Sequence, residues 1–325
     1  MTKNRLLYLD SLRGFAILLV VVGHLIQFNY NDGLLNPVFN IIYSFHMPLF
    51  FFLSGCSRNI SENIKGVAVT SLRDFGKEIW NKLINLIIPS VTWTILVPLF
   101  FQNKIDIQYS SLSSYWFLNI LFVIYVLWSA ISLAYNRLKN KWIVIATLIL
   151  GISLCFILNV YRIPLTYFCA FALGYLWQHY SLSEKIPSFV ICILSIIFLL
   201  FVGQYQYGDT LAGNPNRVWL LLPLSSLASI ILHWMFHNNA FNQKILIDLG
   251  QYSLGIYLCH YLFVKLPFVR YVQNDFSNIQ QFFILLLIAI FISYICVFVQ
   301  KFIIQINWLS GFLYGNWKFL NRIKK

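Results

Sequence analysis

Long uncharged apolar runs recur along the whole chain, and no other sequence feature restricts its fold as strongly. A helical membrane span needs about 20 mainly apolar residues. Such runs lie at 12–28, 37–56, 83–101, 115–134, 142–158, 161–178, 188–204, 218–236, 252–268 and 281–305. The sequence therefore predicts an all-α, polytopic membrane helix bundle of about ten transmembrane helices, forming a single domain over residues 1–325.

The composition excludes the main soluble classes. Apolar residues make up 59% of the chain and charged residues only 10%, against roughly 45–50% and about 25% in an average soluble domain. A soluble fold of this length could not cover so many apolar side chains. The six cysteines are scattered through apolar runs without C-x-x-C or zinc-like spacing, so we expect neither a disulfide framework nor a metal site.

The basic residues predict the orientation of the chain. Under ten crossings, 17 of the 23 lysines and arginines lie on the side of the N-terminus. Only Lys104, Arg162, Arg217 and Arg270 lie in loops on the other side. Because cytoplasmic loops retain positive residues, both termini are expected in the cytoplasm, and the net charge of +13 needs no nucleic-acid partner. The long loop 57–82 is expected to hold an amphipathic interfacial helix.

Ionisable groups inside the first run are the sharpest candidates for function, since such groups are costly within a membrane. Arg13 and His24 are eleven positions apart, which places them on one helix face about 16 Å apart along the axis. Asp10 lies one turn before Arg13 and is expected to pair with it. Snorkelling of Arg13 to the headgroups, and a packing role for His24, are the structural alternatives.

A second membrane histidine, His46, lies two residues before Pro48 in the second run. The proline frees a backbone carbonyl, which is tolerated where the backbone lines an enclosed cavity. A simple proline kink, with His46 bonded to a neighbouring helix, is the alternative.

Two later segments add further candidates. Tyr257 and His260 share a helical face at a spacing of three residues. Tyr115 and Trp116 open the fourth run, where aromatic residues are expected at the membrane interface but could also bind a substrate. Asn119 lies one turn further in.

At these residues the sequence resembles the acyltransferase-3 family of integral membrane acyltransferases, in particular its O-acetyltransferases of bacterial surface glycans. The resemblance rests on four segments: LDSLRGFAILLVVVGH with its R-x10-H spacing, YSFHMPLFFFLSG, YWFLNILF and GQYSLGIYLCHYLF. They occur in order from the first run to the ninth, so the likeness covers nearly the whole chain.

The resemblance implies a ten-span bundle in the bacterial cytoplasmic membrane that uses an acyl-CoA donor, usually acetyl-CoA, and a sugar hydroxyl acceptor. In the family, the histidine matching His24 is regarded as catalytic, and the arginine matching Arg13 as important for donor binding or site structure. We expect acetyl-CoA, a glycan or lipid-linked sugar and membrane lipids as partners, with no permanently bound cofactor. The oligomeric state stays open, a homodimer included.

These residues suggest a mechanism for acyl transfer. We expect His24 to take the acceptor proton as general base, with His46 or Asn119 orienting it or donating to the oxyanion. Arg13 and Arg58, with Asp10 beside Arg13, would hold the phosphates of CoA at the cytoplasmic mouth. Tyr115, Trp116, Tyr257 and His260 are the candidates for substrate binding.

Two other classes of function compete with this interpretation. A multi-span transporter or flippase of a glycan or acylated intermediate would also place histidines and broken helices along its path. A non-catalytic scaffold in a glycan-assembly complex would need its histidines only for stability.

Overall fold

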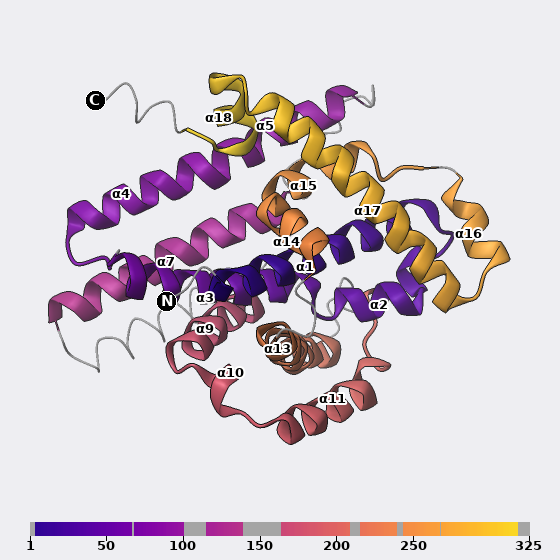
Figure 1. Ribbon diagram of the computed structural model, residues 1–325, viewed down its shortest axis with the longest axis horizontal. Helices are drawn as coiled ribbons and strands as arrows, with labels where there is room; N and C mark the ends of the chain where they lie inside the picture. Colours follow the sequence, from indigo (N-terminus) through magenta and orange to yellow (C-terminus); the bar gives the residue numbers. More distant parts are fainter. Residues whose placement is uncertain are drawn as a thin grey trace. The chain divides into compact units, whose positions relative to one another are not determined.

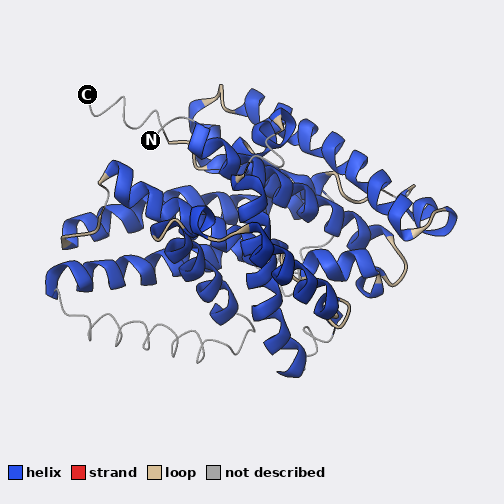
Figure 2. Ribbon diagram, turned by 60° about the horizontal axis from the view of Figure 1, so that its bottom comes forward, coloured by secondary structure: helices blue, strands red, loops and turns tan. Residues whose placement is uncertain are grey.

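The computed structural model is helical throughout the residues that it describes, which are 4–66, 68–100, 115–138, 164–208, 215–238, 243–266 and 268–317. Figure 2 shows helices joined by loops, and these described ranges contain no strand. The predicted all-α class is therefore confirmed. The chain forms two compact units, one of Met1–Ser61 with Thr166–Val297 and the other of Glu62–Leu165 with Phe298–Lys325.

Six helical segments are long and apolar enough to cross a membrane, and each coincides with one of the predicted runs. They are Leu7–Asn29, Pro37–Asn63, Leu72–Leu99, Trp116–Arg137, Leu220–His237 and Asn278–Ile303. The chain is thus a polytopic membrane protein, while the number of ten crossings stays a prediction. Two further runs form the shorter helices α9 (Pro164–His179) and α11 (Ser188–Val202), and the run 142–158 lies outside the described residues.

The run 252–268 differs from the prediction because it is not one continuous helix. It consists of α15 (Ser253–Cys259), the 3-10 turn η4 (His260–Leu262) and a non-helical segment after it. Hydropathy alone overlooks this break, because the polar contacts that hold the non-helical backbone come from a distant part of the chain. This short interrupted segment carries His260 and contributes directly to the candidate site.

Helix α1 (Asn4–Asn29) is the buried centre of the first unit. Leu12, Ile17 and Leu25 on it are fully buried, as expected for a helix that is apolar all round. Helix α14 (Lys244–Gln251) lies along it (Figure 1). The two backbones approach so closely that a Cβ at Gly250 would overlap the carbonyl oxygen of Asp10.

The second predicted run folds as two helices, α2 (Pro37–Tyr43) and α3 (His46–Lys65), with a short turn between them. The side chain of Asn36 caps α2 by accepting hydrogen bonds from the backbone N–H groups of Val38 and Phe39, and Pro37 occupies the first turn. The interruption at 44–45 precedes Pro48, which cannot donate a backbone hydrogen bond. His46 is consequently the first residue of α3.

The first unit contains further helices. They are α10 (Leu182–Lys185), α13 (Pro215–His237), α16 (Val269–Asp275) and most of α17 (Asn278–Ile303), with the turn η1 (Gly33–Leu35) after α1. Helix α13 contacts both α1 and α11. The thiol of Cys56 on α3 donates to the carbonyl oxygen of Gly174 on α9 at 3.2 Å, which ties these two helices together.

The second unit contains α4 (Leu72–Lys82), the π-helical turn η2 (Leu83–Ile87), α5 (Ile88–Phe100), α7 (Trp116–Leu138) and α18 (Asn307–Tyr314). Helix α4 begins with a capping box, in which Ser71 and Asp74 bond each other's backbone N–H groups. It lies in the loop for which the sequence predicts an amphipathic helix. The indole of Trp93 donates to the carbonyl oxygen of Leu313 at 2.8 Å and joins α5 to α18.

Candidate active site

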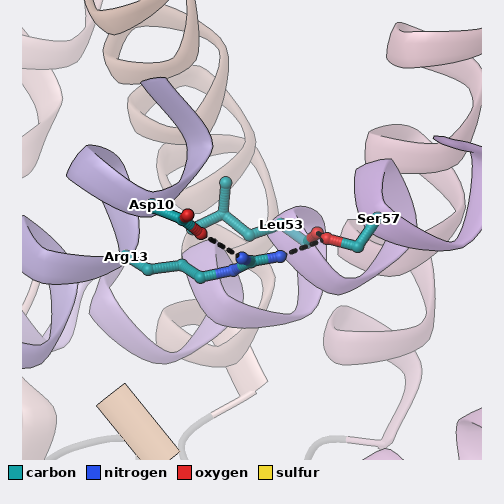
Figure 3. Close-up of polar contacts among 4 residues, drawn as sticks. All are labelled: Asp10, Arg13, Leu53 and Ser57. Carbon is teal, nitrogen blue, oxygen red and sulfur yellow. Dashed lines mark hydrogen bonds and ion pairs between the residues drawn. The ribbon is translucent and has the colours of Figure 1, made fainter. Parts of the chain in front are cut away.

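Arg13 contacts two partners at once in the N-terminal half of α1. Its Nη1 lies 2.7 Å from Asp10 Oδ1 and its Nη2 lies 2.5 Å from Ser57 Oγ, and Figure 3 shows the guanidinium between these two groups. Ser57 Oγ in turn donates to the carbonyl oxygen of Leu53 at 2.6 Å. The predicted pairing of Arg13 with Asp10 is confirmed, and the contact to Ser57 joins α1 to α3.

Arg58 follows Ser57 directly on α3, and its side chain is only 6% exposed. An arginine is seldom so deeply buried unless its charge is compensated. Arg13 by contrast keeps 30% of its side chain exposed. With five N–H donors in a guanidinium, Arg13 retains donors for an anion while it holds Asp10 and Ser57.

His24 lies on the same helix as Arg13, eleven residues further along an uninterrupted α1. Its Nδ1 is 3.0 Å from Gln27 Oε1, and the same amide oxygen accepts a hydrogen bond of 2.9 Å from the Tyr43 hydroxyl. On the other side of the ring, Nε2 is 3.2 Å from the hydroxyl of Tyr261. Because Gln27 Oε1 can only accept, Nδ1 carries the hydrogen and Nε2 presents a lone pair.

Aromatic rings enclose the imidazole of His24. Phe28, His260 and Tyr261 have ring centroids at 5.6, 5.2 and 4.9 Å from that of His24. The neighbouring Gly23 leaves room for the ring of Tyr43, since a Cβ there would lie 2.7 Å from Tyr43 Cε2. The site therefore combines an imidazole held by hydrogen bonds with a cluster of neighbouring aromatic rings.

His46 approaches this group through Tyr43, whose ring centroid lies 4.5 Å from that of His46. Its Nδ1 donates to the carbonyl oxygen of Ile42 at 2.8 Å, a carbonyl at the end of α2. In this tautomer Nε2 of a neutral His46 is a hydrogen-bond acceptor. His46 thus packs against the ring of Tyr43. Gln27, and not His46, makes the hydrogen bond that orients His24.

His260 is fully buried at the start of η4. Its Nδ1 donates to the carbonyl oxygen of Ile256 at 3.0 Å. Its ring stacks on that of His24 at an interplanar angle of 29°. Tyr257, the other residue predicted on this face, is buried with its ring centroid 6.0 Å from that of His260.

Asn29 at the end of α1 fixes the broken segment that carries His260 and Tyr261. Its Nδ2 donates to the carbonyl oxygens of Leu25 and Val264 at 2.9 and 2.7 Å. Its Oδ1 accepts from the backbone N–H of Leu266 at 2.8 Å. The bonds to Val264 and Leu266 satisfy backbone groups that no helix satisfies, and they hold the segment 264–266 against the helix of His24.

The remaining predicted residues belong to the second unit. Tyr115 is buried, Trp116 begins α7, and Asn119 Oδ1 accepts a hydrogen bond of 3.2 Å from Ser90 Oγ. The hydrogen bonds around His24 described above all come from the first unit. The predicted roles of Tyr115, Trp116 and Asn119 in binding or catalysis stay predictions.

Sequence reasoning missed four residues that contact the predicted ones: Gln27, Tyr43, Ser57 and Tyr261. A local signal existed only for Gln27, which follows His24 by three residues and so shares its helix face. Ser57, Tyr43 and Tyr261 reach the site through tertiary packing. Among the described residues no cluster of three histidine, cysteine or acidic side chains could hold a metal ion.

Comparison with known proteins decides the family. The model of the family described as "Acyltransferase domain" matches residues 6–298 of the chain. The chain belongs to this acyltransferase family. As a member, it is a membrane acyltransferase, and its matched region contains Arg13, His24, His46 and His260.

Two relatives carry the same name, Nodulation protein NolL. The protein of Sinorhizobium fredii is 30% identical to the chain, and the alignment covers 79% of the chain and 77% of the relative. That of Mesorhizobium japonicum is 25% identical, with coverage of 79% and 76%. No solved structure matches the chain.

Proposed function

We propose that this acyltransferase transfers an acetyl group from acetyl-CoA to a hydroxyl of a surface polysaccharide or lipid-linked sugar, in the bacterial cytoplasmic membrane with both termini in the cytoplasm. The observation that carries the proposal is the environment of His24. Its Nδ1 is fixed by Gln27, and its Nε2 lies 3.2 Å from an aromatic hydroxyl. An imidazole with a lone pair already directed at an O–H group is suited to be a general base.

The proposed reaction moves one proton twice, first to His24 and then from it. As the acceptor oxygen attacks the thioester carbonyl, its proton moves to His24 Nε2 and the new C–O bond forms. Collapse of the tetrahedral intermediate breaks the C–S bond, and the imidazolium returns the proton to the CoA thiolate. Gln27 Oε1 holds the Nδ1–H throughout, so the ring keeps one orientation in both steps. A bound donor and acceptor would have to displace water from this partly exposed imidazole for transfer to outpace hydrolysis of the thioester.

The proposed role of Arg13 is to bind the phosphates of the donor, acetyl-CoA. Arg13 lies about 16 Å along α1 from His24, a span that suits the extended pantetheine arm between the phosphates of CoA and its thioester. Asp10 and Ser57 fix its guanidinium, and its exposed part retains donors for phosphate oxygens. Arg58, the next residue after Ser57, adds positive charge on α3.

The acceptor is proposed to bind to residues around His24. The elements η4 and α15 bring Tyr261, His260 and Tyr257 to the site of His24. We assign His46 the role of packing against Tyr43. Asn119, Tyr115 and Trp116 remain candidates for the oxyanion and for the acceptor. The name shared by the two relatives, Nodulation protein NolL, states no acceptor.

The test is transfer of labelled acetyl from acetyl-CoA by the purified full-length protein in lipid vesicles. His24→Ala is expected to lower transfer at least 100-fold, in the range of a lost general base. The exposed histidine of α9, in the variant His179→Ala, is the matched control and is expected to retain activity. A His24→Ala protein that remains folded and transfers normally would refute the base assignment.

A cell-based measurement identifies the acceptor and separates transfer from transport. Mass spectrometry of surface glycans, with and without the gene, should show the loss of one acetyl group. A transporter would instead move labelled glycan across sealed vesicles without consuming acetyl-CoA. Unchanged glycan acetylation in the deleted strain would contradict the proposed function.

A further inference from the structure

The imidazole of His260 has one nitrogen satisfied and one unsatisfied. Nδ1 donates to the carbonyl oxygen of Ile256 at 3.0 Å, so in the neutral ring Nε2 is an acceptor. Nε2 is buried and has no hydrogen-bond partner within the part of the chain that the structure describes. Buried polar atoms are nearly always paired, so this nitrogen is a candidate contact for a ligand.

The ring that carries the unsatisfied nitrogen packs against the candidate site. The two nitrogens lie on different sides of an imidazole ring, and Nδ1 is directed back at the backbone of α15. Nε2 therefore points away from α15. The ring centroid of His260 is 5.2 Å from that of His24 and 4.5 Å from that of Tyr261. The ring of His260 thus lies beside the base and beside the phenol whose hydroxyl now contacts it.

Two neighbouring acceptors require two donors. His24 Nε2 accepts a hydrogen bond from the Tyr261 hydroxyl. The oxygen of that hydroxyl marks the position that we assign to a substrate hydroxyl. An acceptor nitrogen without charge or carboxylate partner is matched by a neutral O–H, the main donor of a sugar. Hydroxyls on adjacent carbons are close enough for two stacked imidazoles to bind them together.

We propose that His260 Nε2 binds a second hydroxyl of the acceptor, so that the acceptor class is a vicinal diol. The inference rests on the proposed function, because it assumes that His24 activates the first hydroxyl. The second hydroxyl keeps its proton and donates it to His260, while the first loses its proton to His24. His260 then selects which hydroxyl of the sugar reaches the base.

The position of the natural acetyl group tests the inference without any variant. NMR of the surface glycan should place the acetyl that depends on this gene on a carbon whose neighbour bears a free hydroxyl. An acetyl group with no free hydroxyl on an adjacent carbon would overturn the inference and leave the proposed function intact. A glycan whose acetylation does not depend on the gene would instead refute the proposed function.

Two isosteric variants test the residue itself. The amide of His260→Asn replaces Nδ1 and keeps a partner for Ile256, whereas the amide of His260→Gln reaches the position of Nε2. The probes are the deacetylated repeat oligosaccharide of the glycan and the same compound lacking the neighbouring hydroxyl, with labelled acetyl-CoA and the full-length protein.

The expected result is a ratio of kcat/KM between the two probes. In the natural protein and in His260→Gln, removal of the neighbouring hydroxyl lowers kcat/KM by about 10- to 100-fold. In His260→Asn the two probes react equally. Each ratio is measured within one preparation, so partial loss of folded protein cancels. A natural protein that does not discriminate, or a His260→Asn protein that discriminates as well as the natural one, would overturn the inference.

Discussion

The hydroxyl oxygen of Tyr261 lies 3.2 Å from Nε2 of His24, although 237 positions of the chain separate the two residues. The contact exists because Asn29, five residues after His24, bonds the backbone at Val264 and Leu266. The phenol thereby occupies the nitrogen that we assign to the acceptor hydroxyl. An incoming acceptor has to displace it.

Removing the phenol oxygen should therefore favour the acceptor. In Tyr261→Phe the acceptor no longer competes with one neutral hydrogen bond, and its KM should fall by roughly 2- to 10-fold with kcat retained. Acceptor titrations at saturating acetyl-CoA measure this change. A loss of kcat comparable to that of His24→Ala would show that the Tyr261 hydroxyl itself takes part in the reaction.

Gln27 should control the tautomer of His24. In Gln27→Leu, Nδ1 loses its acceptor, and the transfer rate should fall by about 10- to 100-fold because the ring can turn and exchange its protonated nitrogen. Gln27→Glu retains an oxygen that accepts from Nδ1–H and should keep more activity than the leucine variant. Rates of labelled acetyl transfer by both variants and by the natural protein measure the effect. A Gln27→Leu protein that transfers as fast as the natural protein would contradict the assignment.

Arg13 should act on the donor. Lysine offers a point charge in place of a planar fork, so Arg13→Lys cannot hold Asp10 and Ser57 together as arginine does. We expect the KM for acetyl-CoA to rise roughly tenfold with little change in kcat. Ser57→Ala keeps the pair with Asp10 and serves as the milder control. An unchanged KM for acetyl-CoA in Arg13→Lys would exclude a role of Arg13 in donor binding.

Close packing of α1 on α14 should make Gly250 intolerant of a side chain. The Cβ of Gly250→Ala would meet the carbonyl oxygen of Asp10, and forcing atoms into a packed interface costs about 1–3 kcal/mol of stability. Gly203→Ala is the matched control, because nothing lies within 4 Å of a Cβ at that position. Thermal unfolding in detergent should show a lower Tm for Gly250→Ala alone.

The sequence predicted those features of the fold that depend on local spacing. The long apolar runs identified the helices, and the three-residue spacing of Asp10 and Arg13 placed their side chains within reach of each other. Membership of the acyltransferase family was recognisable from the motifs around Arg13, His24 and His46. Each of these inferences needs only one helix or one short segment.

The contacts between distant segments could not be predicted in the same way. No pattern in the sequence links Tyr261 to His24, or Ser57 to Arg13, because these pairs arise from how helices pack. The break after Cys259 is likewise hidden within an apolar run, since its backbone is stabilised by the side chain of Asn29. Hydropathy measures how readily a segment is buried, but it does not reveal the distant side chains that form hydrogen bonds to its backbone.

The bonds from Asn29 to the backbone at Val264 and Leu266 have a consequence for the biogenesis of this protein. His24 enters the membrane early in synthesis, but its enclosure by His260 and Tyr261 is added only when residues near position 266 have emerged from the ribosome. A nascent chain shorter than this has His24 but lacks the neighbouring rings of His260 and Tyr261. The order of translation therefore delays completion of this ring cluster until most of the chain has been synthesised.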